Sequence, residues 1–178
     1  AWVTPYVLDP NDPQTIFLGY KELYKSTDRG DSWTQLTNLE ITNYIRSIAI
    51  SSSNNQYLYM SDFNKLWKST DGGSSWLEIT NGLPFTSNDI TYITIKDDDP
   101  NTVWITLGEY NSNKVFQTTD GGASWTDISA GLPPIPVMSI VQNKQNDVDT
   151  ELYVGTDVGV YQKIGNNNWS SYSTGLPK

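Results

Sequence analysis

The chain contains no cysteine and no histidine among its 178 residues. Disulfides, thiol nucleophiles, imidazole bases and the usual zinc sites are therefore excluded, and we expect no cofactor and no metal. With 11 basic against 20 acidic residues, the formal net charge is -9, which argues against nucleic acids and anionic lipid surfaces as partners. No apolar run approaches the roughly 20 residues of a membrane span. Because the chain starts at Ala1 without an initiator methionine, we expect a piece of a longer polypeptide.

Strong helix formers are also scarce. Only 4 residues are alanine, whereas serine, threonine and asparagine together number 53 and aromatic residues number 22. Strand and turn formers therefore dominate the composition, which predicts an all-β protein.

An internal repeat organises the chain. Three segments align without gaps: STDRGDSW at 26–33, STDGGSSW at 69–76 and TTDGGASW at 118–125. Their closing tryptophans are 43 and 49 residues apart. A fourth copy at 152–177 keeps an aromatic residue, a tryptophan and a closing GLP, but it has lost the aspartate. Such a period is typical of repeat architectures.

Each repeat predicts four short strands. Apolar and polar residues alternate at Ile45–Ile50 and Ile90–Ile95, and turn-rich segments separate these from further strands at Tyr57–Met60 and Val103–Leu107. Four strands in each unit of this length predict the blades of a β-propeller. The expected blades are 1–39, 40–84, 85–133 and 134–178 of one propeller domain.

The three repeated segments, which we call the Asp corners, have a structural explanation. An aspartate in a tight turn accepts hydrogen bonds from backbone N–H groups, and a glycine two positions later permits positive φ. The tryptophan is expected to lie between adjacent sheets. The residues predicted to have these structural roles are Asp28, Gly30, Trp33, Asp71, Gly73, Trp76, Asp120, Gly122 and Trp125.

The Asp corners resemble the Asp-box of the sialidase, or bacterial neuraminidase, repeat. This repeat occurs in sialidases, xyloglucan-cleaving hydrolases, sortilin-type receptors and a photosystem II assembly factor. The resemblance implies a β-propeller whose boxes lie away from the binding face. The longer segment Gly131–Pro177 resembles the last blades of large type IX-secreted surface proteins of Bacteroidetes, which implies a secreted or cell-surface location.

Few residues of the chain are candidates for catalysis. Recognition of a sialic carboxylate needs a cluster of three arginines, whereas only Arg29 and Arg46 are present, so sialidase activity is disfavoured. An inverting glycoside hydrolase needs two carboxylates roughly 6.5–9.5 Å apart. Asp62 and Glu109, in turns opposite the Asp corners, are the alternative catalytic pair, and solvated turn residues are the competing interpretation. The acidic run at 97–99 indicates a turn rather than a calcium loop.

Recognition is the function that remains. The loops opposite the Asp corners contain tyrosine, phenylalanine and asparagine, which suit stacking on sugar rings or docking of a peptide. The loop at 109–113 is longer than its equivalents and is the best single candidate for a specific contact. The predicted ligand-binding residues are Tyr44, Phe63, Tyr110 and Asn111, with Tyr20 and Phe85 among the neighbouring loop aromatics.

We therefore expect a non-catalytic, extracellular propeller scaffold or binding module for a protein or glycan. The alternative is part of a xyloglucanase-like hydrolase whose catalytic residues lie partly outside this segment; an intracellular assembly factor is a third option. Because a propeller must close to hide its sheet edges, we expect the four blades to be incomplete. The expected partners are then further blades or a second copy.

Overall fold

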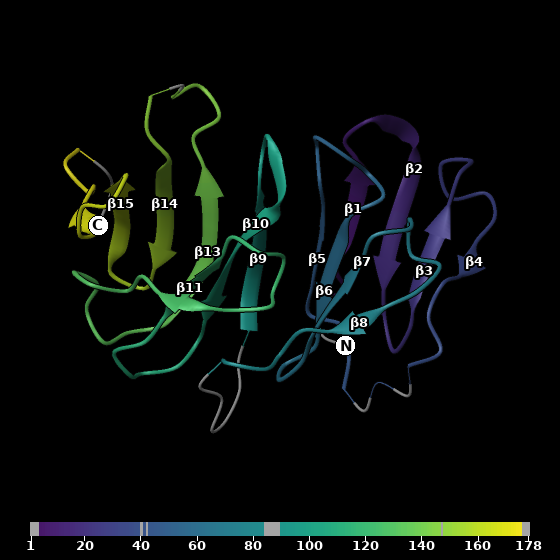
Figure 1. Cartoon of the computed structure of the whole chain (residues 1–178), viewed down its shortest axis with the longest axis horizontal. Helices are drawn as coiled ribbons and strands as arrows, with labels where there is room; N and C mark the ends of the chain where they lie inside the picture. Colours follow the sequence, from purple (N-terminus) through teal and green to yellow (C-terminus); the bar gives the residue numbers. More distant parts are fainter. Residues whose placement is uncertain (1–3, 40, 42, 84–89, 147, 176–178) are drawn as a thin grey trace.

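The computed structural model of the chain describes residues 4–39, 41, 43–83, 90–146 and 148–175. Within these residues it contains four antiparallel sheets of four strands each and no helix, which confirms the predicted all-β propeller architecture. Strands follow one another in chain order within every sheet, so each sheet is a meander. We call the sheets blades A to D; Figure 1 shows them in sequence from blade A on the right to blade D on the left.

The strands are short, and the fourth strand of each blade has only two residues. Blade A contains β1 (Tyr6–Asp9), β2 (Asp12–Gly19), β3 (Leu23–Ser26) and β4 (Thr34–Gln35). Blade B contains β5 (Ser47–Ile50), β6 (Leu58–Ser61), β7 (Leu66–Ser69) and β8 (Leu77–Glu78). Blade C contains β9 (Ile90–Lys96), β10 (Asp99–Leu107), β11 (Val115–Thr118) and β12 (Thr126–Asp127). Blade D contains β13 (Val137–Gln142), β14 (Glu151–Thr156), β15 (Gly159–Ile164) and β16 (Ser170–Ser171).

Strand limits differ slightly from the sequence-based expectation. Strand β5 begins at Ser47 rather than Ile45. The reason is that the Ile45 amide donates to the Tyr20 carbonyl of blade A at 2.7 Å, so this residue joins the neighbouring blade instead of its own ladder. The predicted boundary between the second and third blades, at Pro84 and Phe85, lies outside the described residues.

The core lies between blades rather than within one. Three apolar clusters fill the junctions from A to B, from B to C and from C to D. At the first junction, the fully buried Leu58 and Met60 of blade B pack with Phe17 and Leu23 of blade A. Burying one such side chain contributes about 1.5–3 kcal/mol, so stacking of blades stabilises the fold.

The meander gives each blade two ends, so the molecule has two faces. The β1–β2 turns and the Asp corners, which connect the third and fourth strands, lie on one face, called here the corner face. The β2–β3 turns and the connections between blades lie on the other, called here the loop face. In Figure 1 the corner face is at the top and the loop face at the bottom.

Candidate functional site

The Asp corners are internally hydrogen-bonded turns. In blade B, Asp71 Oδ1 accepts hydrogen bonds from the Ser75 amide and the Ser69 hydroxyl, both at 2.8 Å, and Asp71 Oδ2 accepts from the Ser75 hydroxyl at 2.6 Å. Ser69 Oγ in turn accepts from the Gly73 amide at 2.9 Å. These bonds to the ionised carboxylate, led by that from the Ser75 hydroxyl, lower the pKa of Asp71 to about 2.

The same bonds recur in blades A and C. Asp28 Oδ1 accepts from the Ser32 amide at 2.9 Å, and Asp120 Oδ1 accepts from the Ser124 amide at 2.9 Å. The serine hydroxyl of each turn again contributes most, lowering the pKa of Asp28 to about 2 and that of Asp120 still further. Because hydrogen bonds to the ionised form lower the pKa of all three carboxyl groups, these groups are ionised near neutral pH. The aspartates of the Asp corners therefore cannot donate a proton there.

The corner tryptophans point toward the preceding blade. The indole N–H of Trp125 donates to the Ile79 carbonyl of blade B at 3.1 Å, and that of Trp169 donates to the Ile128 carbonyl of blade C at 2.7 Å. Trp76 packs into the cluster between blades A and B. Trp33 differs from the expectation that each ring lies between two sheets, because no described blade precedes it and it remains 41% exposed.

A second set of hydroxyl groups, which the sequence analysis missed, fastens the loop face. Ser129 Oγ accepts from the buried amides of Lys114 and Val115, at 2.7 and 3.0 Å. Equivalent bonds link Thr37 to the Leu23 amide, Thr80 to the Leu66 amide and Ser173 to the Val160 amide. Each hydroxyl residue lies four positions after a corner tryptophan or its blade D equivalent, Trp169, so the spacing was visible in the sequence.

Aromatic side chains gather on the loop face where blades A and B meet. The rings of Tyr20 and Tyr44 are 5.0 Å apart and tilted by 54°. The guanidinium of Arg46 lies 4.8 Å from the ring centre of Phe63. Tyr44 and Arg46 flank the buried Ile45 on one extended segment, which brings both pairs to this face. Arg46 was not among the predicted ligand residues, although its alternation with Tyr44 could have indicated it.

The other predicted ligand residues lie on the longer loop of blade C. Tyr110 is 75% exposed, and the Asn111 amide donates to the Glu109 carboxylate at 2.5 Å. Behind them, the fully buried Lys114 donates from its ammonium to the Glu109 carbonyl, and burial lowers the pKa of this lysine. The loop therefore exposes the Tyr110 ring to solvent, while the neighbouring Glu109 is held by hydrogen bonds from Asn111 and Lys114. Phe85, which precedes it in the chain, lies outside the described residues.

The two carboxylates considered as a catalytic pair have different environments. Asp62 is only 1% exposed, and its Oδ1 accepts from the amides of Asn64 and Lys65, both at 2.7 Å. It therefore closes the β6–β7 turn. Glu109 is half-buried in the β10–β11 loop and holds Asn111. Both lie on the loop face, as the sequence suggested.

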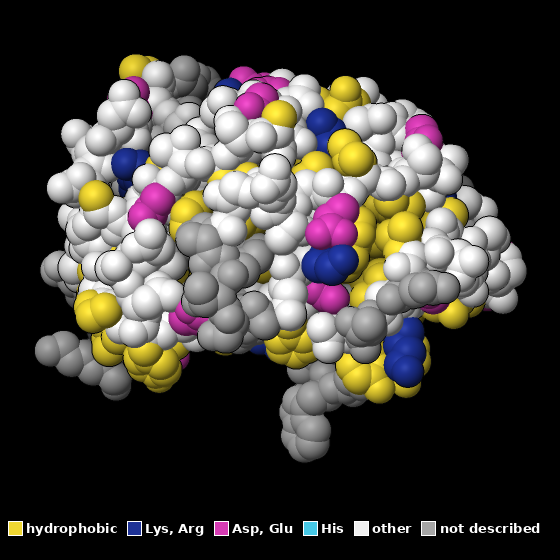
Figure 2. Space-filling model, turned by 60° about the horizontal axis from the view of Figure 1, so that its bottom comes forward, with side chains coloured by type: hydrophobic (Ala, Val, Ile, Leu, Met, Phe, Trp, Pro, Cys, Tyr) yellow, Lys and Arg dark blue, Asp and Glu magenta, His cyan; other side chains and the backbone are white. Residues whose placement is uncertain are grey.

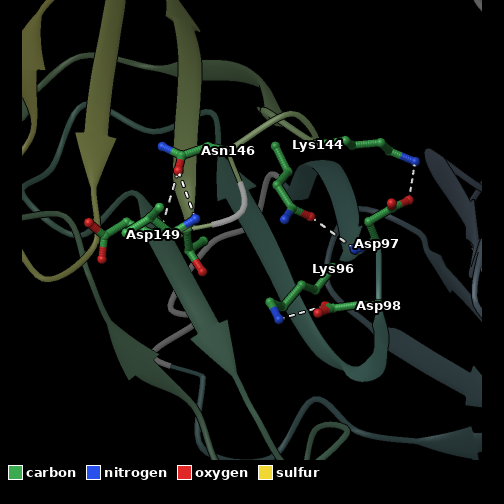
Figure 3. A pocket seen from close by; sticks show the side chains of 9 residues that line it. Lys96, Asp97, Asp98, Lys144, Asn146 and Asp149 are labelled. Carbon is green, nitrogen blue, oxygen red and sulfur yellow. Dashed lines mark hydrogen bonds and ion pairs between the residues drawn. The ribbon is translucent and has the colours of Figure 1, made fainter.

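A polar hollow of about 270 Å³ lies on the corner face between blades C and D, and Figure 3 shows its lining. Lys144 contacts Asp97 and Lys96 contacts Asp98, each at 2.5 Å. Each of these four charged groups is thus already paired with a group of opposite charge. Ion pairs at such exposed positions contribute about 0–1 kcal/mol to the free energy of unfolding. The acidic run at 97–99 forms the β9–β10 turn, and Asp97 additionally accepts from the Ser52 hydroxyl of blade B at 2.6 Å.

Figure 2 turns the loop face toward the viewer. Apolar side chains emerge there among polar ones, and basic groups lie beside acidic ones rather than forming a patch of one sign. The described residues include no group of three or more acidic side chains that could hold a metal ion. They also contain no helix of the length and apolarity that crossing a bilayer requires.

Comparisons with known proteins agree on the architecture. The sequence model of the family Sortilin-Vps10 (sortilin, neurotensin receptor 3) matches residues 21–172. A search of curated proteins finds no match. Among solved structures, an ancestral GH74 enzyme superposes with a TM-score of 0.74 at 21% identity, over 97% of this chain and 26% of its own.

Two further structures extend the comparison. The GH74 xyloglucanase from Xanthomonas campestris gives a TM-score of 0.72 at 14% identity, over 97% of this chain and 31% of its own. YCF48 bound to D1 peptide gives 0.64 at 13% identity, over 94% of this chain and 57% of its own. The chain thus spans between about a quarter and three fifths of these proteins. At such identities the likeness shows the fold alone.

Proposed function

The chain belongs to the Sortilin-Vps10 family, and from this premise we propose that it is a non-catalytic binding module that recognises a protein or glycan on its loop face. The observation that carries the proposal is the pairing of Tyr20 with Tyr44 and of Arg46 with Phe63 on that face. Rings held by their neighbours lose little conformational entropy when a ligand stacks on them, and tyrosine hydroxyls and a guanidinium add directional donors.

Proteins of similar architecture support a recognition role without fixing the ligand. The family description names a receptor, and one similar structure is bound to a peptide. Another similar structure is a xyloglucanase, so its ligand is a polysaccharide. Both ligand classes suit a face of aromatic rings with hydroxyl, amide and guanidinium groups at their edges.

An enzymatic role has less support. In the pair considered for glycoside hydrolysis, Asp62 already accepts two turn amides, and removing that carboxylate would leave both amides without their acceptor. A general acid or base needs a carboxyl group free to exchange a proton with substrate. We therefore treat Asp62 and Glu109 as turn residues in this proposal.

The proposed setting is outside the cell, on the surface or secreted. The resemblance of the segment 131–177 to bacterial surface proteins supports it. Surface biotinylation of intact cells that produce the protein, together with assay of the culture medium, tests this part: a labelled chain on the cells or a chain in the medium is expected, and a chain found only after lysis contradicts it.

Binding to peptide and glycan arrays tests the main proposal. The wild-type chain is expected to bind at least one class of probe, and the double variant Tyr44→Ala with Phe63→Ala is expected to lose at least about tenfold in affinity. Leu77→Ala is the matched control, because Leu77 is 66% exposed but lies on the outer strand β8. Equal binding by all three proteins contradicts the proposal.

A hydrolysis assay on xyloglucan separates the enzymatic alternative. No release of reducing ends is expected from the wild-type chain. Release that disappears in Asp62→Asn or Glu109→Gln, with both variants folded by circular dichroism, would replace the binding proposal with catalysis.

A further inference from the structure

A second polar hollow, of about 320 Å³, lies between blades C and D beside the turn that replaces the Asp corner in blade D. It is distinct from the hollow in Figure 3, although Asp149 borders both. Its lining combines Trp104 and Gln117 of blade C with residues of blade D that include Asp149 and Lys163. Both walls therefore belong to described blades, and the volume is that of a small ligand pocket, which begins at about 300 Å³.

This hollow contains a hydrogen-bond donor without a partner. Trp104 is fully buried, and its indole N–H has no acceptor among the described residues. The counterpart of Trp104 in blade B is Tyr59 by strand register, and the Tyr59 hydroxyl donates to the Pro100 carbonyl at 2.8 Å. Buried donors nearly always have a partner in native proteins, so the indole N–H points to an acceptor that enters the hollow.

The C–D junction also lacks an ammonium group that the two other junctions have. Lys25 of blade A lies 5.3 Å from the centre of the Phe17 ring. Lys68 of blade B lies 5.9 Å from the centre of the Tyr59 ring. Each lysine pairs with its ring residue across neighbouring strands, and at the same position blade C has the uncharged Gln117. Blade C therefore brings no lysine to this position of its junction with blade D.

A carboxylate lies near the position of the missing ammonium. In the B–C junction, a Cβ added to Gly121 would overlap the Lys68 ammonium, so this group lies directly against the corner glycine. Gly165 is the counterpart of Gly121 in blade D, since both amides donate to a carbonyl of the hairpin of the first two strands, at 2.9 and 2.8 Å. A Cβ added to Gly165 would instead meet Asp149 Oδ1, at 3.3 Å. Among the described residues, no cation pairs with the Asp149 carboxylate.

Blade D contributes a cation of its own to the hollow. Lys163 is half-buried there, and its ammonium donates to the Asn167 carbonyl. Burial lowers the pKa of Lys163, and within the described part of the chain no carboxylate pairs with it. An ammonium has three donors, so Lys163 can donate further. A ligand carboxylate in the hollow would stabilise this charge and would offer the acceptor that the Trp104 indole lacks.

We propose that this hollow binds a small free amino acid, whose carboxylate accepts from Trp104 and Lys163 and whose ammonium pairs with Asp149. A carboxylate alone would bring an anion near Asp149 without a compensating cation. An amine alone would leave the indole N–H without an acceptor, so a molecule that carries both groups suits the hollow best. The side-chain amides of Gln117 and Asn166 also line the hollow and can bond to either group. This site is separate from the recognition surface proposed on the loop face.

Nuclear magnetic resonance of the chain labelled with ¹⁵N-tryptophan tests the proposal, with glycine and β-alanine as probes. Each indole N–H gives one resonance, and Trp104→Phe identifies that of Trp104. We expect the probes to shift this resonance in a saturable manner. The resonances of Trp125 and Trp169, whose indoles already donate to backbone carbonyls, are expected to stay in place. Acetate and methylamine, which each carry only one of the two groups, are expected to bind at least about fivefold more weakly.

Asp149→Asn and Lys163→Met each remove one of the charges and are expected to weaken glycine binding at least about fivefold. Lys144→Met is the matched control, because Lys144 borders the hollow of Figure 3 and pairs with Asp97; this variant is expected to bind glycine like the wild type. Calorimetric titration of glycine into the wild type and these three variants gives the same comparison without Trp104→Phe, should that variant fail to fold.

Three outcomes overturn the proposal. The first is an unmoved Trp104 resonance at up to roughly 100 mM of either probe, well beyond millimolar affinity; contact of the indole proton with bound water would then identify water as the acceptor. The second is equal binding of acetate and glycine, which overturns the assignment of an amino acid. The third is wild-type affinity in both Asp149→Asn and Lys163→Met, which overturns the assigned residues.

Discussion

Blades C and D of this molecule have the same four strands but different corners. Blade C keeps the complete Asp corner, with Asp120 holding Thr118 and Ser124. In blade D the equivalent turn rests mainly on backbone bonds, from Gly165 to the Thr150 carbonyl at 2.8 Å and from Asn167 to the Ile164 carbonyl at 3.1 Å. Both sheets nevertheless form, so a four-stranded blade does not require the corner aspartate.

Two features common to all four blades explain this result. Each blade has a corner tryptophan, and Trp169 in blade D is only 3% exposed, with its amide donating to the Ala130 carbonyl of blade C at 2.9 Å. Each blade also keeps the loop-face hydroxyl, which is Ser173 in blade D. The corner tryptophan and the loop-face hydroxyl are therefore shared by all four blades, and the Asp corner adds local hydrogen bonds in blades A, B and C.

The C–D junction also lacks a hydrogen bond that the B–C junction has. Tyr59 of blade B donates its hydroxyl to blade C, but the equivalent Trp104 of blade C has a buried indole N–H without an acceptor among the described residues. Blade D has a hydrogen-bond cluster of its own. The Glu151 carboxylate accepts from Tyr153, Asn146, Asn143 and Gln162. These bonds lower the pKa of Glu151 to about 2 and hold Asn143 and Asn146 against β14.

The largest effect is expected from Gly131→Ala. Gly131 has φ of +100°, and an added Cβ would overlap the backbone carbonyl oxygen of Trp169, which cannot move without disturbing the C–D junction. We expect a loss of about 2–5 kcal/mol in the free energy of unfolding by urea. Gly82→Ala is the control, with φ of +89° and no atom within 4 Å of the added Cβ, and is expected to lose about 1–2 kcal/mol. Equal losses in both variants would show that the junction does not depend on this contact.

A smaller effect is expected from removing the loop-face hydroxyl. Ser129→Ala leaves the buried amides of Lys114 and Val115 without their acceptor, which is expected to lower the free energy of unfolding by about 1–3 kcal/mol. Ser173→Ala in blade D removes one partly buried bond of 3.3 Å and is expected to lower it by about 1 kcal/mol. Urea titration of both variants checks which loss is larger. An unchanged free energy of unfolding in Ser129→Ala would show that this hydroxyl does not stabilise the fold.

The next largest effect is expected from acid pH, through the carboxylates of the Asp corners. Because folding lowers the pKa of Asp71 to about 2, the ionised carboxylate favours the folded state, so its contribution is complete above about pH 4 and is lost as pH falls toward about 2. Asp71→Asn is expected to flatten the pH dependence of the urea midpoint over this interval. Asp31→Asn, an exposed turn residue, is the control. An unchanged slope in Asp71→Asn would contradict the hydrogen-bond assignment.

The smallest effect on stability is expected from Tyr110→Ala. Its ring is 75% exposed, so its removal is expected to change the free energy of unfolding by less than about 0.5 kcal/mol. A loss above about 1 kcal/mol in urea titration would show that the ring packs in the fold and is not reserved for a ligand.

Much of the fold could be predicted because its signals are local. The spacing of Asp71, Gly73 and Trp76 depends on one turn, and alternation of residues depends on one strand. The loop-face hydroxyls were equally visible but carry no known turn signature, so their recurrence passed unnoticed. The contacts between Arg46 and Phe63, or between Trp125 and Ile79, join different segments, and single-sequence patterns do not encode such partners.

Amide hydrogen exchange, resolved by residue, tests the central claim most directly, namely that the Asp corners are rigid structural turns and the loop at 109–113 remains available for recognition. We expect strong protection of the amides of Gly30, Gly73 and Gly122, which donate to corner hydroxyls, and fast exchange at 110–112. Fast exchange at the three glycines together with protection of the loop would contradict it.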